Sequence, residues 1–283
     1  MDQKKKGIYI TIVIVLAVAL LGSAIYLFQY FMSSKENADL NEQLREDLIS
    51  TGPATTAEAT TEAPTEEETT EPTTEPQATY AEGRDYKAFY EKNPNEDFVG
   101  WLRIDGTKID YPVMQSSVDN ANYYLYRDYN KKNSTPGTIY AREQCDVFTP
   151  SDNVTLYGHT MKDGSMFAYL HNYTAKATWD RNSLIFFDTF NPKTGDVEYH
   201  TYKIFAVFKT SANIGEGFSY HKFENAATKQ DFDDFVSTCK QLAQKDFYDT
   251  GITPQYGDKL LCLSTCEYTL NNGRLVVAAV RIS

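Results

Sequence analysis

The chain has 283 residues, four cysteines, four histidines and a formal net charge of −12. This length suits one medium domain with additional segments, or two small domains. The negative charge argues against nucleic acid as a partner, because phosphate binding requires clustered Lys and Arg. Residues 1–32 carry +2, residues 33–80 carry −10 and residues 81–283 carry −4. The acidity therefore belongs to the segment that precedes the globular part.

The first distinct segment is an apolar run from Ile8 to Met32. As a helix rising about 1.5 Å per residue, it is roughly 37 Å long, enough to cross a bilayer core of about 30 Å with some tilt. Lysines at positions 4–6 precede it, so the positive-inside rule predicts a cytoplasmic tail over residues 1–7 and an extracellular location after Met32. A cleaved signal peptide is the alternative, but its apolar region would be shorter. The sequence favours an uncleaved transmembrane signal-anchor over residues 8–32, crossing the cell membrane once.

Residues 33–80 are polar, and Thr51–Thr79 consists almost wholly of Thr, Glu, Pro and Ala. This composition cannot build a core, so it predicts disorder. At about 3.1 Å per residue, its prolines and charges would extend it over as much as roughly 90 Å. Leu40, Leu44 and Leu48 have helical spacing, which fits either a short continuation of the membrane helix or solvated chain. We expect residues 33–80 to be a disordered spacer through a cell wall, the alternative being an interaction tail.

From residue 81 the composition becomes globular and aromatic. Short apolar runs bounded by Gly, Pro, Asn and Asp predict an all-β sandwich or barrel over residues 81–283. Asp85–Lys92 fits a short helix, and Thr228–Phe247 places its apolar side chains on one stripe, as in an amphipathic helix. We therefore expect a mainly β barrel with one substantial inserted helix. Its predicted strands are Phe98–Ile104, Lys108–Val113, Gly137–Tyr140, Asn153–Tyr157, Leu184–Phe187, Val197–Phe208, Leu260–Cys266 and Leu275–Ile282.

A candidate nucleophile ends one of these strands. Alternation along Leu260–Cys266 places Cys262, Ser264 and Cys266 on one face. Arg274 begins the next strand; if the two strands form an antiparallel hairpin, Cys266 and Arg274 can lie opposite, with Cβ atoms about 5 Å apart. A guanidinium beside a thiol favours the thiolate and offers donors to a developing oxyanion. The alternative is a small core cysteine and a surface arginine.

The remaining cysteines indicate neither disulfides nor metal. Cys262 and Cys266 would lie roughly 13 Å apart along one strand, too far to bridge. Cys145 and Cys239 can pair only if the fold brings them together, so free thiols are expected. The Cys and His spacing matches no zinc pattern, and we expect neither a metal nor a cofactor.

His159 directly follows a predicted strand, where loops carrying catalytic groups leave a rigid scaffold. Its position alone does not distinguish it from His171, His200 and His221. The motifs do: Tyr157-Gly158-His159-Thr160-Met161, then Leu263-Ser264-Thr265-Cys266, then Arg274-Leu275-Val276-Val277 resemble, in this order, the histidine, cysteine and arginine regions of class B sortases.

The resemblance to these cysteine transpeptidases of Gram-positive bacteria covers essentially residues 85–283. It implies a closed eight-stranded β-barrel with an N-terminal helix and a long helix inserted before the cysteine strand. Supporting matches lie at Asp97–Leu102, Ile109–Val113, Asp119-Asn120 and Tyr124-Leu125.

The resemblance also implies a reaction. Cys266 attacks a Thr carbonyl in the C-terminal sorting signal of a secreted protein and forms a thioacyl-enzyme. His159 transfers protons and Arg274 stabilises the oxyanion. The acceptor is an amine of a peptidoglycan precursor, as part of the cell wall, or of a pilin.

Substrate contacts are expected at Leu125, Ser264, Thr265 and Glu267, and selectivity in residues 117–128 and 210–225. Ser264 could instead orient Arg274 or make an ordinary strand hydrogen bond, and Glu267 could be a solvated loop carboxylate.

Two rival interpretations remain. Papain-like proteases place Cys before His, the reverse of this order, and the Ser-His-Gly-Cys signature of L,D-transpeptidases is absent. A non-catalytic, wall-associated binding or adhesion module would suit the anchor and spacer equally well.

Overall fold

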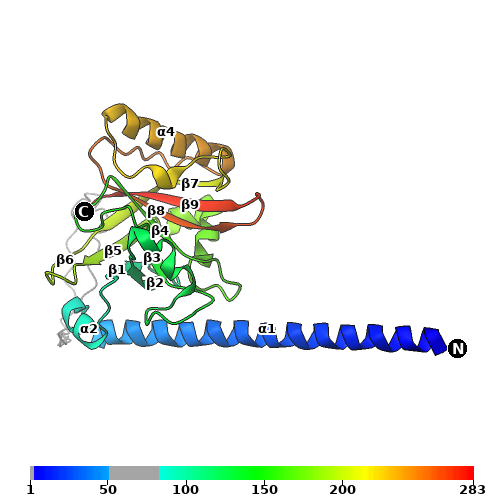
Figure 1. The fold of residues 1–283 in the computed structure, drawn as a ribbon. Coiled ribbons are helices and arrows are strands. Elements are labelled where there is room, and N and C mark those ends of the chain that lie inside the picture. The colour runs from blue at the N-terminus through cyan, green and yellow to red at the C-terminus, as the bar shows by residue number, and fades with distance from the viewer. Residues whose placement is uncertain (1–2, 51–82) are drawn as a thin grey trace, which may run out of the picture.

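The computed structural model describes residues 3–50 and 83–283. Eight strands close a barrel in the order β1-β2-β3-β4-β8-β9-β7-β5, because β1 pairs back onto β5, and β6 adds a short edge to β5. Figure 1 shows α4 on one side of the barrel and α1 with α2 on the opposite side. The expected closed eight-stranded barrel, with an N-terminal helix and a long helix before the cysteine strand, is thereby confirmed.

The strands are β1 (Phe98–Arg103), β2 (Asp110–Met114), β3 (Ile139–Ala141), β4 (Asn153–Tyr157), β5 (Leu184–Phe190), β6 (Val197–Glu198), β7 (Thr201–Ser211), β8 (Leu260–Glu267) and β9 (Gly273–Arg281). The helices are α1 (Gln3–Ser50), α2 (Tyr86–Lys92), α3 (Lys176–Arg181) and α4 (Lys229–Asp246), with 3-10 turns η1 (Val118–Asn120), η2 (Tyr123–Tyr126), η3 (Ala168–Thr174) and η4 (Tyr220–Lys222).

Strand β8 is buried on both faces near its start. Leu261 and Leu263 belong to the cluster that fills the barrel, whereas Leu260 and Cys262 belong to the cluster beneath α4. Because side chains alternate along a strand, Ser264 and Cys266 lie on the same outer face as Leu260 and Cys262. The nucleophile candidate therefore lies on the outer surface of the barrel wall.

Helix α4 coincides with the amphipathic segment expected from the sequence. Thr228 is its N-cap: the Thr228 hydroxyl accepts from the Asp231 N–H, and the Asp231 carboxylate accepts from the Thr228 N–H. This capping box satisfies two backbone donors that the helix start would leave open. Phe232, Phe235 and Cys239 are buried against the outer face of β7 and its neighbours.

One strand prediction differs from the structure. Residues 197–208, expected as a single strand, form β6 and the beginning of β7. The intervening His200 carbonyl accepts a hydrogen bond from the Phe187 N–H across the sheet. β6 and β7 pair with β5 in one unbroken antiparallel register, with Glu198 opposite Thr189 and Thr201 opposite Phe186, so the chain continues along β5 through the gap at residues 199–200.

Helix α1 is continuous from Gln3 to Ser50. Within the described part of the chain, it is the one helix long and apolar enough to cross a membrane, with a mean hydropathy of 2.7 and no burial in its most apolar stretch. Figure 1 shows that its N-terminal half extends beyond the barrel, while its C-terminal half lies alongside it.

The C-terminal half of α1 corrects one expected boundary. Residues 33–50, expected within the disordered spacer, are helical and contact the barrel. Leu44 and Leu48 are fully buried in one cluster with Phe89 and Trp101. Their spacing of four residues presents one apolar stripe, and burial of that stripe stabilises the helix. The rest of the expected spacer, residues 51–80, lies outside the described residues.

Candidate active site

The hairpin of β8 and β9 places Cys266 opposite Arg274. The two residues are direct partners in the antiparallel register, which continues to Glu267 opposite Gly273. Opposed residues share a face, so both side chains project to the same side of the hairpin. The hydrogen bonds that the structure shows for the Arg274 side chain all use Nη1, which donates to the Asn272 and Gly273 carbonyls and to the Asn272 side chain. Nε and Nη2 therefore remain available to donate to a ligand.

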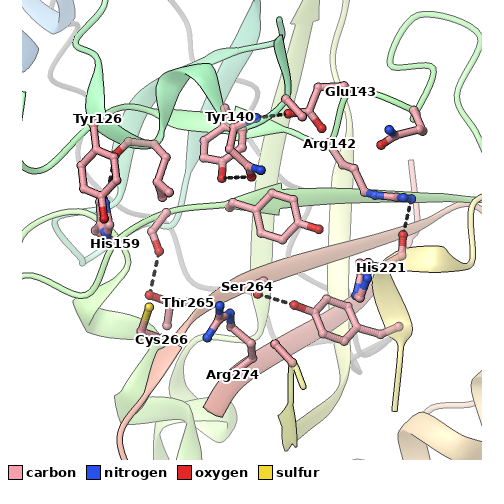
Figure 2. Close-up of a pocket in the computed structure, with 18 residues that line it drawn as sticks. Tyr126, Tyr140, Arg142, Glu143, His159, His221, Ser264, Thr265, Cys266 and Arg274 are labelled. Carbon is pink, nitrogen blue, oxygen red and sulfur yellow. Dashed lines mark hydrogen bonds between the residues drawn. The ribbon is translucent and has the colours of Figure 1, made fainter. Parts of the chain in front are cut away.

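His159 is brought to the same place by a parallel strand pair. Strand β4 pairs with β8 so that Tyr157 lies beside Ser264, and two residues further along each chain His159 and Cys266 lie at the same level. Gly158, between Tyr157 and His159, is tightly packed, because an added Cβ would lie 2.5 Å from Ile139 Cδ1. Figure 2 shows the Cys266 sulfur between the His159 and Arg274 side chains.

The ring of His159 is held in one orientation. Its Nε2 lies 2.9 Å from the Leu125 carbonyl oxygen, which can only accept, so Nε2 carries the hydrogen. The Tyr126 ring covers it at 5.3 Å between centroids. Burial lowers the pKa of His159 below its usual value, and the bond to Leu125 offsets this only in part. At neutral pH the ring is therefore neutral and presents Nδ1 as a proton acceptor.

A chain of hydrogen bonds lies beneath the two catalytic candidates. Thr265 Oγ1 donates its hydrogen to the Gly158 carbonyl at 2.7 Å. Thr160 Oγ1 is therefore the donor in the 2.7 Å hydrogen bond between the Thr160 and Thr265 hydroxyls. His171 Nε2 lies 3.1 Å from both Thr160 Oγ1 and the Cys266 carbonyl and donates to them. The chain thus connects the residues on either side of His159 to Cys266 and its preceding residue.

One cavity of about 520 Å³ is bordered by His159, Cys266 and Arg274. Its walls include aromatic and charged side chains from η2, η4 and the β3–β4 connection. Of these, only His221 was considered individually from the sequence, as one of four histidines. Two of them, Tyr220 and His221, lie in the segment 210–225 expected to set selectivity, and Tyr126 lies in the segment 117–128. The cavity is lined by Ala121, Asn122, Leu125, Tyr126, Tyr140, Arg142, Glu143, Gln144, Tyr157, Gly158, His159, Ala212, Tyr220, His221, Ser264, Thr265, Cys266 and Arg274.

The four expected substrate contacts have different positions. Leu125 lines the cavity and supplies the carbonyl that holds His159. Ser264 also lines it, and its hydroxyl contacts that of Tyr220 at 2.6 Å. Thr265 borders the cavity, but its hydroxyl belongs to the chain beneath it.

Glu267 is buried under the turn of the hairpin. Its carboxylate accepts from the Thr269 hydroxyl and from the Thr269 and Leu270 N–H groups, and it pairs with Lys209 at 2.9 Å. Burial alone would raise the pKa of Glu267, but the bonds from Thr269 and Lys209 outweigh it and lower the pKa to about 2. This arrangement gives Glu267 a bracing role in the hairpin, different from the expected substrate contact.

Cys266 differs from the other three thiols in exposure. All four cysteines are free, as expected, but Cys145, Cys239 and Cys262 are buried and Cys266 is half-exposed. Burial raises the pKa of Cys145 to about 11 and that of Cys239 and Cys262 as well. Only Cys266 thus combines access to the cavity with a neighbouring guanidinium. Among the described residues, no three metal-ligating side chains come together.

Comparison with known proteins finds a sortase domain over residues 102–282. The chain is 36% identical to sortase B of Listeria monocytogenes over 185 residues, and this aligned region covers 65% of this chain and 69% of that protein. It is 28% identical over 187 residues to sortase B of Staphylococcus aureus, covering 65% of this chain and 70% of that protein. Sortase B of Bacillus anthracis in complex with AAEK1 has a similar structure, with 27% identity, a TM-score of 0.63 and coverage of 89% of this chain and 99% of that chain. The Staphylococcus aureus sortase B–substrate complex is also similar, with 25% identity, a TM-score of 0.59 and coverage of 70% and 86%.

The domain match includes His159, Cys266 and Arg274. It decides between the enzyme and the non-catalytic adhesion module in favour of the enzyme. The family also implies two kinds of partner, a polypeptide that bears a sorting signal and an amine acceptor. The chain belongs to the sortase family, in its class B, and is a cysteine transpeptidase.

Proposed function

We propose that this transpeptidase cleaves the C-terminal sorting signal of secreted proteins at a Thr carbonyl and transfers them to an amine of the cell wall or of a pilin. The observation that carries the proposal is the placement of Cys266 opposite Arg274, with His159 at the same level on the neighbouring strand. The apolar half of α1 supports a single-pass anchor in the cell membrane, with the catalytic domain outside.

The first half-reaction begins at Cys266. His159 Nδ1 takes the thiol proton, and the sulfur attacks the Thr carbonyl carbon. The carbonyl oxygen becomes an oxyanion, which Arg274 Nε and Nη2 stabilise by donating to it. The C–N bond then breaks, the leaving amine receives the proton from His159, and a thioester remains on Cys266.

The second half-reaction reverses these steps with a new amine. The acceptor amine attacks the thioester carbonyl and loses a proton to His159, and the C–S bond breaks to regenerate the thiol. Ser264, Leu125 and Thr265 border the path of the sorting peptide. The Ser264–Tyr220 hydroxyl pair offers it both a donor and an acceptor.

The test combines the full chain in detergent with a fluorogenic sorting peptide and an amine. We expect cleavage, a transfer product and a trapped acyl adduct on Cys266 by mass spectrometry. Cys266→Ala should abolish all three, whereas Cys145→Ala, which changes a buried thiol, serves as the matched control. An active Cys266→Ala variant would overturn the assignment, and an Arg274→Lys variant with full activity would remove the role of the planar guanidinium.

A further inference from the structure

The contacts of α1 determine which end of the barrel faces a membrane that α1 crosses. Tyr30 packs against the barrel, and the Ser33 hydroxyl accepts from the Thr135 N–H at 2.9 Å. The Asn37 amide donates to Ser134 Oγ at 2.9 Å and to the Gly137 carbonyl at 3.0 Å. Further along, Asp47 accepts from Lys92 at 2.7 Å. The barrel therefore lies against α1 from Tyr30 onward, with no free linker between the apolar and docked halves of the helix.

The catalytic hairpin lies at the end of the barrel nearest the apolar half of α1. Figure 1 shows the β8–β9 turn directed toward the N-terminal end of α1, whereas α2 lies beside the C-terminal end. Along the axis of α1, the turn lies level with the middle of the helix, where the half that extends beyond the barrel meets the half that lies alongside it (Figure 1). Since the expected membrane segment ends at Met32, this turn lies close to the level at which α1 leaves the bilayer.

The same end of the barrel exposes apolar side chains from two adjoining loops. Tyr268 and Leu270 in the β8–β9 turn are 76% and 43% exposed, and Ile214 in the loop after β7 is fully exposed. The loops are held together because the Ala212 N–H donates to the Asn272 carbonyl at 3.0 Å. We call Ile214, Tyr268 and Leu270 the hairpin patch. Exposed Tyr and aliphatic side chains at one end of a domain suit the interface between lipid headgroups and acyl chains.

We propose that the hairpin patch rests in the headgroup region of the outer leaflet, so that the catalytic cavity opens beside the bilayer surface. The inference rests on the proposed membrane anchor. Cys266 and Arg274 are the second residue pair from the turn, after Glu267 and Gly273, and Ala212 lines the cavity from the neighbouring loop. The docked half of α1 fixes the distance of the hairpin from the bilayer. The sorting signal therefore reaches Cys266 at the membrane surface, and residues 51–82 are not needed as a tether.

The test measures quenching of tryptophan fluorescence by brominated lipids. The full chain is reconstituted into vesicles of phosphatidylglycerol and phosphatidylcholine brominated near the headgroup, and each variant is compared with the unsubstituted chain. Tyr268→Trp places the probe in the patch, and Tyr256→Trp is the matched control. Tyr256 is also an exposed tyrosine, but it precedes the start of β8, about 25 Å of strand away from the turn. Phe28→Trp reports on the anchor itself.

We expect Phe28→Trp and Tyr268→Trp to be quenched at least twofold more than Tyr256→Trp. If Phe28→Trp is quenched but Tyr268→Trp behaves like Tyr256→Trp, the inference fails and the anchor stands. If Phe28→Trp is not quenched, the anchor fails and the inference falls with it. Cleavage of the sorting peptide in detergent is independent of both results.

A second variant tests whether docking of α1 sets the orientation. Leu44→Asp places a charge in the fully buried contact between α1 and the barrel, but leaves the apolar half of α1 unchanged. Combined with Tyr268→Trp, it should lower the quenching to the level of Tyr256→Trp. Retained peptide cleavage in detergent shows that the barrel is folded. Quenching that persists in such a folded, undocked chain would contradict the role of α1.

Discussion

Thr160 lies next to His159 but contributes no side chain to the cavity lining. Its hydroxyl receives a hydrogen bond from His171 and passes one to Thr265, so it joins the loop of His159 to the strand of Cys266. A shift of a few tenths of an ångström between sulfur and imidazole slows proton transfer more than it weakens substrate binding. Thr160 is therefore a positioning residue, and its effect should appear in kcat.

Removal of the Thr160 hydroxyl separates this role from general stability. Thr160→Val keeps the shape of the side chain and should lower kcat about tenfold, or about 1.4 kcal/mol in the barrier, with little change in KM. Thr160→Ser keeps the hydroxyl and should restore kcat. A Gln side chain can reproduce the Nε2 donor of His171, whereas an Asn side chain cannot. We therefore expect His171→Gln to keep kcat and His171→Asn to lower it. Equal kcat values for Thr160→Val and Thr160→Ser would refute the positioning role.

The protonation of His159 should appear in the pH profile. Burial lowers its pKa below the usual 6.5, so the neutral, proton-accepting ring persists below pH 6.5 and is lost as the pH falls through the lowered pKa. We expect the acid limb of kcat/KM to have its midpoint below pH 6.5. A ring titration of His159 by NMR in the Cys266→Ala chain should give the same midpoint. A His159 ring that titrates above pH 6.5 would contradict the burial argument.

At the scale of elements, Glu267 braces the hairpin that carries Cys266 and Arg274. Its pKa of about 2 lies below the ordinary 4.5, so the carboxylate stabilises the folded chain above about pH 4.5, and this stability is lost as the pH falls toward 2. Glu267→Gln should lower the free energy of unfolding at pH 7 by about 1–3 kcal/mol, because charge-assisted hydrogen bonds are lost. The difference from the unsubstituted chain should shrink as the pH is lowered to 3. Urea unfolding at several pH values measures it, and a difference independent of pH would rule out an ionised Glu267 as the brace.

The hairpin was predictable from sequence because its information is local. Alternation along β8 gives the face of Cys266, and only a short turn separates it from Arg274. The position of His159 beside Cys266 depends on the parallel pairing of β4 with β8, whose residues are more than a hundred positions apart. Periodicity contains no signal for such a pairing, so His159 was selected from four histidines by motif resemblance.

The cavity walls were less predictable for a related reason. Tyr126 and Tyr220 come from short 3-10 turns far from β8 in sequence. Aromatic residues are common throughout this chain, and most of the large ones fill the core. Nothing in the local pattern separates the few that line a cavity from the many that pack inside.

At the scale of the whole molecule, the catalytic unit extends into α1. The expected domain began at residue 81, because the Thr/Glu/Pro-rich segment before it has no large apolar residues to pack. The leucines that precede this segment nevertheless return to the barrel, where Leu44 and Leu48 meet Phe89 and Trp101. A low-complexity segment thus marked a break in composition, but not the edge of the folded unit.

Two N-terminal deletions distinguish these boundaries. Deletion of residues 1–32 removes mainly exposed apolar side chains and should leave the free energy of unfolding nearly unchanged. Deletion of residues 1–50 also removes Leu44 and Leu48, and leucines in such fully buried sites contribute about 2–5 kcal/mol each against truncation to Ala. The longer deletion should therefore lower the free energy of unfolding by several kcal/mol, a large part of the roughly 5–15 kcal/mol typical of a domain. Urea unfolding of both chains, followed by tryptophan fluorescence, measures the difference because Trp101 lies in the affected cluster. Equal stability of the two chains would return residues 33–50 to the spacer and detach the barrel from α1.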